Sequence, residues 1–214
     1  MAHPVFAAWH DRSMDQLDAA GLGERRERLV ARARGRVLEI GAGTGRNLPF
    51  YRHVAEVVAL EPDAAMTKRL QLRVEQASVP VTVVQSTIAQ ARLAPHSFDT
   101  IVCSLVLCSV EDVDATLRHV DDLLADGGHV LALEHVRGTG WRARMQDAST
   151  PVWRHVAAGC RANRDPIDAL RRNGFAITDC DRFMMNRTFP IVAPHISAVA
   201  VRKGTRQLQG DTNE

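Results

Sequence analysis

Short apolar runs alternate with amphipathic helical patterns through most of the 214-residue sequence. The clearest strand-length runs cover residues 36–40, 56–60, 81–84, 98–103, 129–135, 176–183 and 195–201. Helical patterns separate the first five runs, which is the arrangement of βα units around a buried parallel sheet. We therefore expect an α/β fold with a doubly wound sheet of seven mostly parallel strands.

The length suits one domain, because domains typically contain about 100–200 residues. We expect residues 1–203 to form that domain. Within it, residues 1–35 read as an N-terminal helical cap, and residues 138–160 interrupt the alternation as an insertion that would cover the substrate. The polar residues 204–214 are expected to be a disordered tail.

Charge and cysteine content exclude several classes of protein. A net charge of +2 is too small for a protein held to nucleic acid mainly by charge. Four cysteines without a C-x-x-C pair do not make a disulfide scaffold. The longest apolar run, residues 101–110, is far shorter than the roughly 20 residues that span a bilayer. We expect a soluble, cytoplasmic, reduced protein without a stable membrane anchor.

A glycine-rich loop follows the first predicted strand, with glycines at positions 41, 43 and 45. Glycines permit positive φ angles and let a ligand approach the backbone closely. A dinucleotide-binding loop has the pattern G-x-G-x-x-G, but Arg46 stands where its third glycine would be. The spacing disfavours a nicotinamide oxidoreductase.

Two carboxylates flank this loop. Glu39 stands two residues before Gly41, where it would repel a phosphate and attract a cation such as an ammonium group. Glu61 ends the second predicted strand and can accept both hydroxyls of a ribose. Together these groups describe a pocket for adenosine linked to a charged amino acid, without phosphate.

Four segments resemble the motifs of class I S-adenosylmethionine-dependent methyltransferases: residues 37–45 (VLEIGAGTG), 59–63 (ALEPD), 97–110 (SFDTIVCSLVLCSV) and 123–136 (LLADGGHVLALEHV). Runs at 102–110, 134–136, 151–153, 159–160 and 194–196, with Arg164, also resemble the alkyl thiol S-methyltransferases of methyltransferase-like group seven. The resemblance implies a Rossmann-like sheet with an antiparallel last strand and S-adenosylmethionine as cofactor.

Residues on the first four strands and their loops are assigned to the methyl donor. They are Glu39, Gly41, Ala42, Gly43, Gly45, Asn47, Glu61, Pro62, Ser86, Thr87, Ser104 and Leu105. The family often has an acid or amide after the third strand to bind adenine. This chain has Ser86 and Thr87 in that region, so these side chains or the backbone would hold the adenine.

The acceptor should lie beyond the carboxyl ends of the strands, where open α/β sheets bind ligands. That position brings Leu107, Cys108 and His135 beside the methyl group, with His135 as the catalytic candidate. The other substrate candidates are Phe6, Trp9, Trp153 and His195, and Trp141 is a further candidate for the apolar lining of the acceptor site. No metal is expected, because His135, Cys160 and His195 show no ligand spacing.

A small-molecule thiol is the preferred acceptor. A thiol with a pKa near 8.5 is partly ionised at neutral pH, so it needs no strong base. One tyrosine in the whole chain is a poor supply for an aromatic cage around an amine.

A phospholipid or quinone-type N-, O- or C-methyltransferase is the alternative enzyme. An S-adenosylmethionine-binding or nucleic-acid-associated protein is the non-enzyme alternative, supported only by basic residues 24–36, which otherwise read as a solvated helix face. The oligomeric state is left open.

Overall fold

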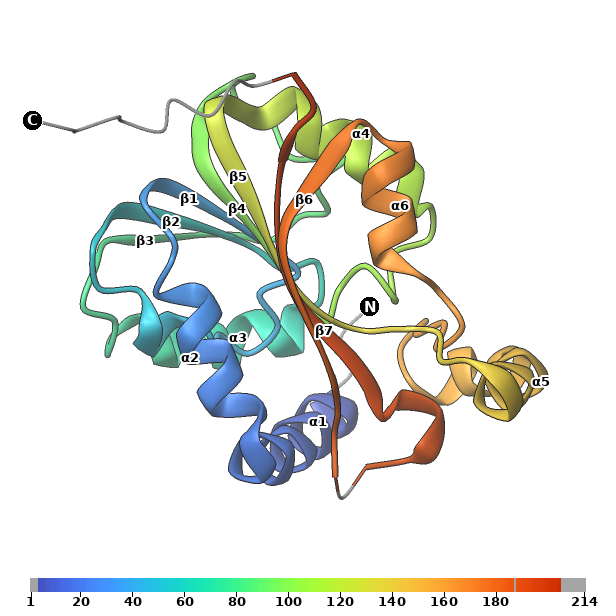
Figure 1. Ribbon diagram of the computed structural model, residues 1–214. Helices are drawn as coiled ribbons and strands as arrows, with labels where there is room; N and C mark the ends of the chain where they lie inside the picture. The colour runs from blue at the N-terminus through green and yellow to red at the C-terminus, as the bar shows by residue number, and fades with distance from the viewer. Residues whose placement is uncertain (1–3, 187, 205–214) are drawn as a thin grey trace, which may run out of the picture.

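The computed structural model describes residues 4–186 and 188–204 and contains one seven-stranded sheet in the order β3-β2-β1-β4-β5-β7-β6 (Figure 1). The strands are β1 Gly35–Ile40, β2 Val54–Leu60, β3 Val81–Val84, β4 Phe98–Ser104, β5 Leu124–His135, β6 Phe175–Met184 and β7 Pro194–Arg202. Strands β1 to β5 pair in parallel, and β7 is antiparallel to both β5 and β6. The predicted fold class, including the antiparallel last strand, is confirmed.

Helices cover both faces of this sheet. They are α1 Pro4–Leu17, α2 Gly23–Val30, α3 Ala64–Val74, α4 Val113–Leu123, α5 Gly140–Val156 and α6 Pro166–Arg172, with short helical turns η1 Asp18–Leu22, η2 Leu48–Phe50 and η3 Pro190–Val192. Leu29 and Leu70 of α2 and α3 pack on one face, and Leu117 and Leu170 of α4 and α6 pack on the other. The central strands therefore lie between two apolar layers, which explains their continuous hydrophobic runs.

Carboxylates cap two of these helices. α3 begins at Ala64 after Asp63, whose Oδ1 accepts hydrogen bonds from the backbone N–H groups of Ala65 (2.8 Å) and Met66 (3.0 Å). Asp112 caps α4 in the same way, because its Oδ1 accepts from the backbone N–H of Ala115. In both cases a carboxylate beside the free N–H groups of the first turn satisfies them directly.

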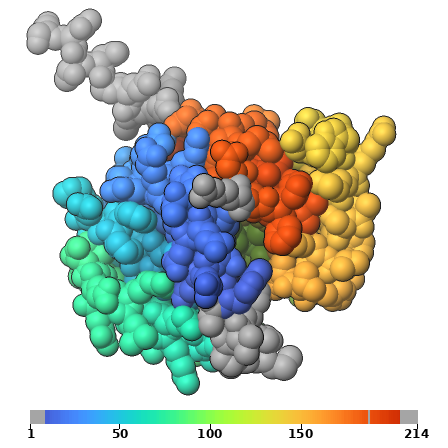
Figure 2. Space-filling model, turned by 90° about the horizontal axis from the view of Figure 1, so that it is seen from below, coloured from blue at the N-terminus to red at the C-terminus, as the bar shows by residue number. Residues whose placement is uncertain are grey.

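The predicted cap and insertion have defined positions in the fold. Helices α1 and α2 form most of residues 1–35, and Figure 2 shows the N-terminal chain between α3 and the β6–β7 segment on the face seen from below. Residues 138–160 contain α5, which lies beside the edge of the sheet (Figure 1). The predicted tail lies outside the described residues, apart from Gly204. Across residues 4–186 and 188–204, no helix is both long and apolar enough to cross a bilayer.

Candidate active site

A cavity of about 850 Å³ lies at the carboxyl ends of β1, β2, β4 and β5. The strand order reverses between β1 and β4, and a crevice at such a switch point is where doubly wound sheets bind ligands. The structure brings these predicted site residues to its wall: Trp9, Gly41, Gly43, Glu61, Pro62, Ser86, Thr87, Leu105, Cys108, His135, Trp153 and His195. The wall thus combines donor and acceptor candidates from segments distant in sequence.

The glycine loop presents bare backbone to this cavity. Gly41 and Gly43 adopt φ angles of 63° and 59°, a region that side-chain-bearing residues rarely enter. A Cβ on Gly41 would lie 2.4 Å from Cγ2 of Val106, so the loop and the segment after β4 approach too closely for a side chain. Gly45 has a different role, because a Cβ there would lie 2.7 Å from Leu70 of α3. Gly45 packs against α3 and lines neither cavity.

Glu61 directly follows β2 at the cavity wall and is hydrogen-bonded to the glycine loop. Its Oε2 accepts a hydrogen bond from the backbone N–H of Gly43 at 2.8 Å, and its Oε1 accepts one from Asp63 at 2.9 Å. Burial raises the pKa of Glu61, while the two backbone donors act against that rise. Each carboxylate oxygen has a second lone pair, so both remain able to accept from ribose hydroxyls.

Glu39 lies in a closed polar cluster behind the loop. Its Oε1 accepts from Nδ2 of Asn47 and its Oε2 from the hydroxyl of Tyr51, both at 2.8 Å. Burial raises the pKa of Glu39 to about 7, although the Tyr51 hydrogen bond and the Arg26 charge oppose the rise. With Ala42, Asn47 and Ser104, Glu39 lines a side cavity of about 70 Å³. Direct contact between Glu39 and the donor's ammonium group stays a prediction.

Arg26 belongs to this cluster, which corrects the expectation of a solvated basic helix. Its guanidinium is buried and donates to Oδ1 of Asn47 at 2.8 Å and to Oγ of Ser104 at 2.9 Å. Position 26 lies three and four residues before Leu29 and Val30, so it shares their inward face of α2. Helical periodicity could therefore have identified it.

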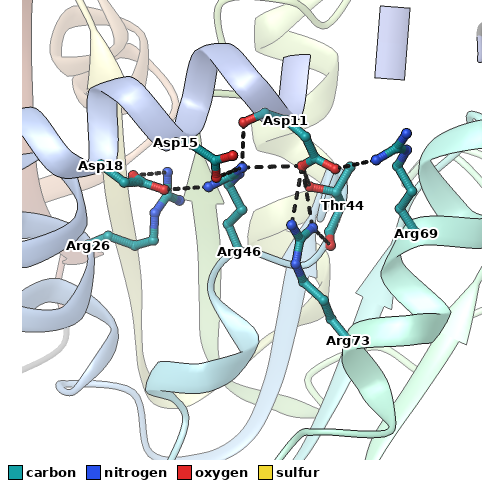
Figure 3. Close-up of polar contacts among 8 residues, drawn as sticks. All are labelled: Asp11, Asp15, Asp18, Arg26, Thr44, Arg46, Arg69 and Arg73. Atoms are coloured by element: carbon teal, nitrogen blue, oxygen red, sulfur yellow. Dashed lines mark hydrogen bonds and ion pairs between the residues drawn. The ribbon is translucent and has the colours of Figure 1, made fainter. Parts of the chain in front are cut away.

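Carboxylates on the first helices bind arginines around the glycine loop (Figure 3). Asp11 of α1 accepts from Oγ1 of Thr44 at 2.6 Å and from Arg69 of α3 at 2.8 Å. Arg46 donates to Asp15 at 2.6 Å and to Asp18 at 2.8 Å. These contacts hold α1 against the glycine loop. The sequence did not predict these ion pairs, because Arg46 was considered only for occupying the position of the third glycine in a dinucleotide-binding loop.

The part of the cavity where the sequence predicts the acceptor contains two histidines and two cysteines. His135 and His195 are directly paired across β5 and β7, with ring centroids 6.2 Å apart. Burial lowers the pKa of His195 to about 4, so its imidazole is neutral at physiological pH. His135 Nε2 lies 3.0 Å from Sγ of Cys160, which also accepts from Nε1 of Trp153 at 3.2 Å. Cys160 thus lies on the cavity wall beside His135, although its spacing in the sequence showed no ligand pattern.

Two predicted walls are placed elsewhere. Leu107 is 1% exposed and packs in the core rather than lining the cavity. The chain turns sharply at Leu105, whose φ is 55°, so that Leu105 and Cys108 reach the cavity while Leu107 points inward. Trp141 on α5 is 61% exposed and does not contact the cavity. The side chain of Phe6 lies outside the part of the structure that is described.

The strand order, with β7 antiparallel to β5, is that of a class I S-adenosylmethionine-dependent methyltransferase. A family model described as a methyltransferase domain matches residues 9–179, and the chain belongs to this family. The cofactor of the class is S-adenosylmethionine, and the open loop at Gly43 beside Glu61 fits it: no atom lies closer than 4.0 Å to a Cβ built on Gly43.

Known proteins of several kinds are similar to this chain. Thiol S-methyltransferase TMT1A from Homo sapiens is 30% identical over 171 residues, covering 78% of this chain and 70% of the relative. A phosphatidylethanolamine N-methyltransferase from Cereibacter sphaeroides is 30% identical over 140 residues, covering 62% and 69%. The structure of an S-adenosylmethionine-dependent methyltransferase from Thermotoga maritima superposes with a TM-score of 0.65 at 17% identity, covering 93% and 99%. The last likeness supports the fold alone.

Proposed function

We propose that this methyltransferase acts on a small-molecule thiol. The observation that carries the proposal is the acceptor end of the cavity, where His135, Cys108 and Trp153 meet the neutral His195. These four side chains carry no carboxylate, which suits an uncharged, partly apolar acceptor better than a cationic amine, although Glu111 and Asp112 line the same cavity. The similarity to a human thiol S-methyltransferase supports the same class of acceptor.

The residues of the chain divide the work of methyl transfer. S-adenosylmethionine supplies an already activated methyl group, so the protein must mainly align the two reactants and exclude water. Glu61 and the backbone of Gly41 and Gly43 bind and orient the donor. His135 lies at the end of β5, where a ring nitrogen can accept the proton of an incoming thiol.

Mass spectrometry of reactions with a panel of alkyl and aryl thiols tests the proposal. The expected result is a methyl thioether that requires the protein and the donor. A control variant, Glu75→Gln, changes an exposed carboxylate that does not line the cavity and should leave the product yield unchanged. A panel in which no thiol is methylated, while an amine lipid is consumed, would contradict the thiol assignment.

Phospholipid methylation is the second candidate, favoured by the similarity to a phosphatidylethanolamine N-methyltransferase. The two candidates differ in how the enzyme reaches its acceptor, because an enzyme that methylates a lipid amine must bind the surface of a bilayer. If the acceptor is a small-molecule thiol, vesicles containing phosphatidylethanolamine should neither bind the protein in a flotation assay nor yield methylated lipid. Methylated lipid in that assay would replace the thiol proposal.

A further inference from the structure

Cys108, His135 and Cys160 form a cluster of metal-ligand side chains inside the large cavity. One ligand atom from each residue lies within 4.8 Å of the other two, and all three side chains are buried. They come from three separate segments: the turn after β4, the end of β5 and the turn after α5. Sequence spacing could not reveal the cluster, because 27 residues separate Cys108 from His135 and 25 separate His135 from Cys160.

The spacing of the ligand atoms suits a tetrahedral metal ion. With metal–sulfur bonds of about 2.3 Å and a metal–nitrogen bond of about 2.0 Å, donor atoms around zinc lie roughly 3.5–3.8 Å apart. His135 Nε2 is 3.0 Å from Sγ of Cys160, so small side-chain rotations would open the cluster to that size. The thiolate and imidazole donors are those that zinc prefers, while hard ions such as magnesium prefer oxygen.

An outer hydrogen bond supports a metal at this position. Nε1 of Trp153 donates to Sγ of Cys160 at 3.2 Å, and such hydrogen bonds commonly orient the ligands of a metal. Nδ1 of His135, the ring nitrogen on the side away from Cys160, is buried and has no hydrogen-bond partner among the described residues, so it is open to bound solvent rather than to the metal. His135 and Trp153 both line the same cavity.

We infer that Cys108, His135 and Cys160 bind a zinc ion whose fourth position opens to the cavity. Three protein ligands with one open position is the arrangement of catalytic zinc sites, whereas structural sites are closed by four. The cavity wall carries all three residues, so the open position faces the space assigned to the acceptor. The cluster belongs to the donor-binding cavity itself rather than to a remote surface.

The role of the ion rests on the proposed function and deepens it. A zinc ion at this position takes the acceptor sulfur as its fourth ligand, and the acceptor's thiol proton leaves to solvent. The acceptor sulfur then forms a bond to the donor's methyl carbon while the sulfonium carbon–sulfur bond breaks, leaving its electron pair on the donor sulfur. In this arrangement His135 acts through the metal that it holds and does not itself accept the thiol proton, so the metal replaces the base role that the proposed function gives to His135 in the absence of a metal.

Cobalt binding to the reduced, chelator-treated protein tests the site without an activity assay. The expected result is one equivalent of bound Co²⁺ with thiolate-to-cobalt absorption and the visible bands of tetrahedral cobalt, and competition by Zn²⁺. Cys108→Ser and Cys160→Ser should lose this spectrum. Cys180→Ser, which changes an exposed cysteine on β6, should keep it. Trp153→Phe should weaken metal binding by roughly 10-fold, since it removes only the outer hydrogen bond.

The outcomes separate the metal site from the thiol function. A folded, reduced protein that shows no tetrahedral cobalt spectrum overturns the site, as does a spectrum that Cys180→Ser abolishes. If a serine variant fails to fold by circular dichroism, the unmodified protein and Trp153→Phe still decide the matter. Metal binding without thiol methylation would refute only the proposed function. Thiol methylation by metal-free protein would refute only the zinc site.

Discussion

The backbone N–H of Gly43 donates a 2.8 Å hydrogen bond to Oε2 of Glu61, which ties the glycine loop to the end of β2. Gly43 needs its positive φ of 59° to aim that N–H at the carboxylate. Glu61 also lines the cavity, so the side chain that shapes the loop still has lone pairs that can accept from the hydroxyls of a ligand.

Glu61→Ala should weaken binding of S-adenosylmethionine by about 1–3 kcal/mol, because polar groups of the donor and the loop lose their partner. Titration calorimetry with the donor and with its demethylated product measures the change. The control is Glu75→Gln, an exposed residue directly after α3, which should bind S-adenosylmethionine with unchanged affinity. Unchanged affinity in Glu61→Ala would place the ribose elsewhere.

Gly41→Ala should destabilise the protein more than Gly127→Ala. Both positions have a positive φ, 63° and 73°, so both substitutions cost about 1–2 kcal/mol of backbone strain. Only the Gly41 variant adds a clash, because its Cβ would lie 2.4 Å from Val106, whereas nothing lies within 4 Å at Gly127. Urea unfolding should show an additional loss of about 1–3 kcal/mol for Gly41→Ala. Equal losses would mean that Val106 yields without cost.

Arg46→Ala should loosen α1 from the glycine loop (Figure 3). Its largely buried guanidinium binds Asp11, Asp15 and Asp18, and loss of charged hydrogen bonds of this kind costs about 1.5–3 kcal/mol. Hydrogen exchange should accelerate at amides of residues 9–22, and urea unfolding should shift accordingly. Arg28→Ala removes an exposed pair with Glu24 and should cost below about 0.5 kcal/mol. Unaltered exchange in Arg46→Ala would show that other contacts hold α1.

Glu39 should make stability fall as the pH rises from 4.5 to about 7. Burial raises the pKa of Glu39 from 4.5 to about 7, so the folded protein binds this proton more tightly than the unfolded chain does. The resulting stabilisation is fully present below pH 4.5 and is lost by about pH 7, an effect of about 3 kcal/mol. Glu39→Gln lacks the titrating group. The difference in unfolding free energy between the two proteins should therefore change across this window, and a constant difference would contradict the buried acid.

His195 should remain neutral through the physiological pH range. Burial lowers the pKa of its imidazole to about 4, although the hydrogen bond between Nδ1 and the Ala193 carbonyl acts in the other direction. In nuclear magnetic resonance, the His195 ring signals, assigned by loss in His195→Gln, should not titrate between pH 5 and 8. The urea-unfolded protein provides the control, with histidine signals titrating near about 6.5. Titration of His195 near neutrality in the folded protein would show that water reaches the ring.

The sheet and the donor half of the cavity could be predicted from the sequence because their signals are local. Each signal spans only a few residues: an apolar run of strand length, the three glycines directly after the first run, and Glu61 directly after the second. Parallel βα units then place strand ends at one edge without further information. Helix starts at Asp63 and Asp112 were less accessible, since several neighbouring polar residues can cap the same helix.

The sequence alone determined the α/β class and the bare glycine loop, because hydrophobic periodicity and glycine conformation act over short stretches of chain, and the resemblance of its motifs implied the family and the antiparallel last strand. Only the tertiary structure decided that Asp11 meets Arg46 and Arg73, that Arg26 is buried beside Asn47, and that Cys160 reaches His135. These pairings join segments separated by 21 to 62 residues. Which of the many charged and sulfur-bearing side chains meet depends on how whole elements pack, and no local pattern encodes that choice.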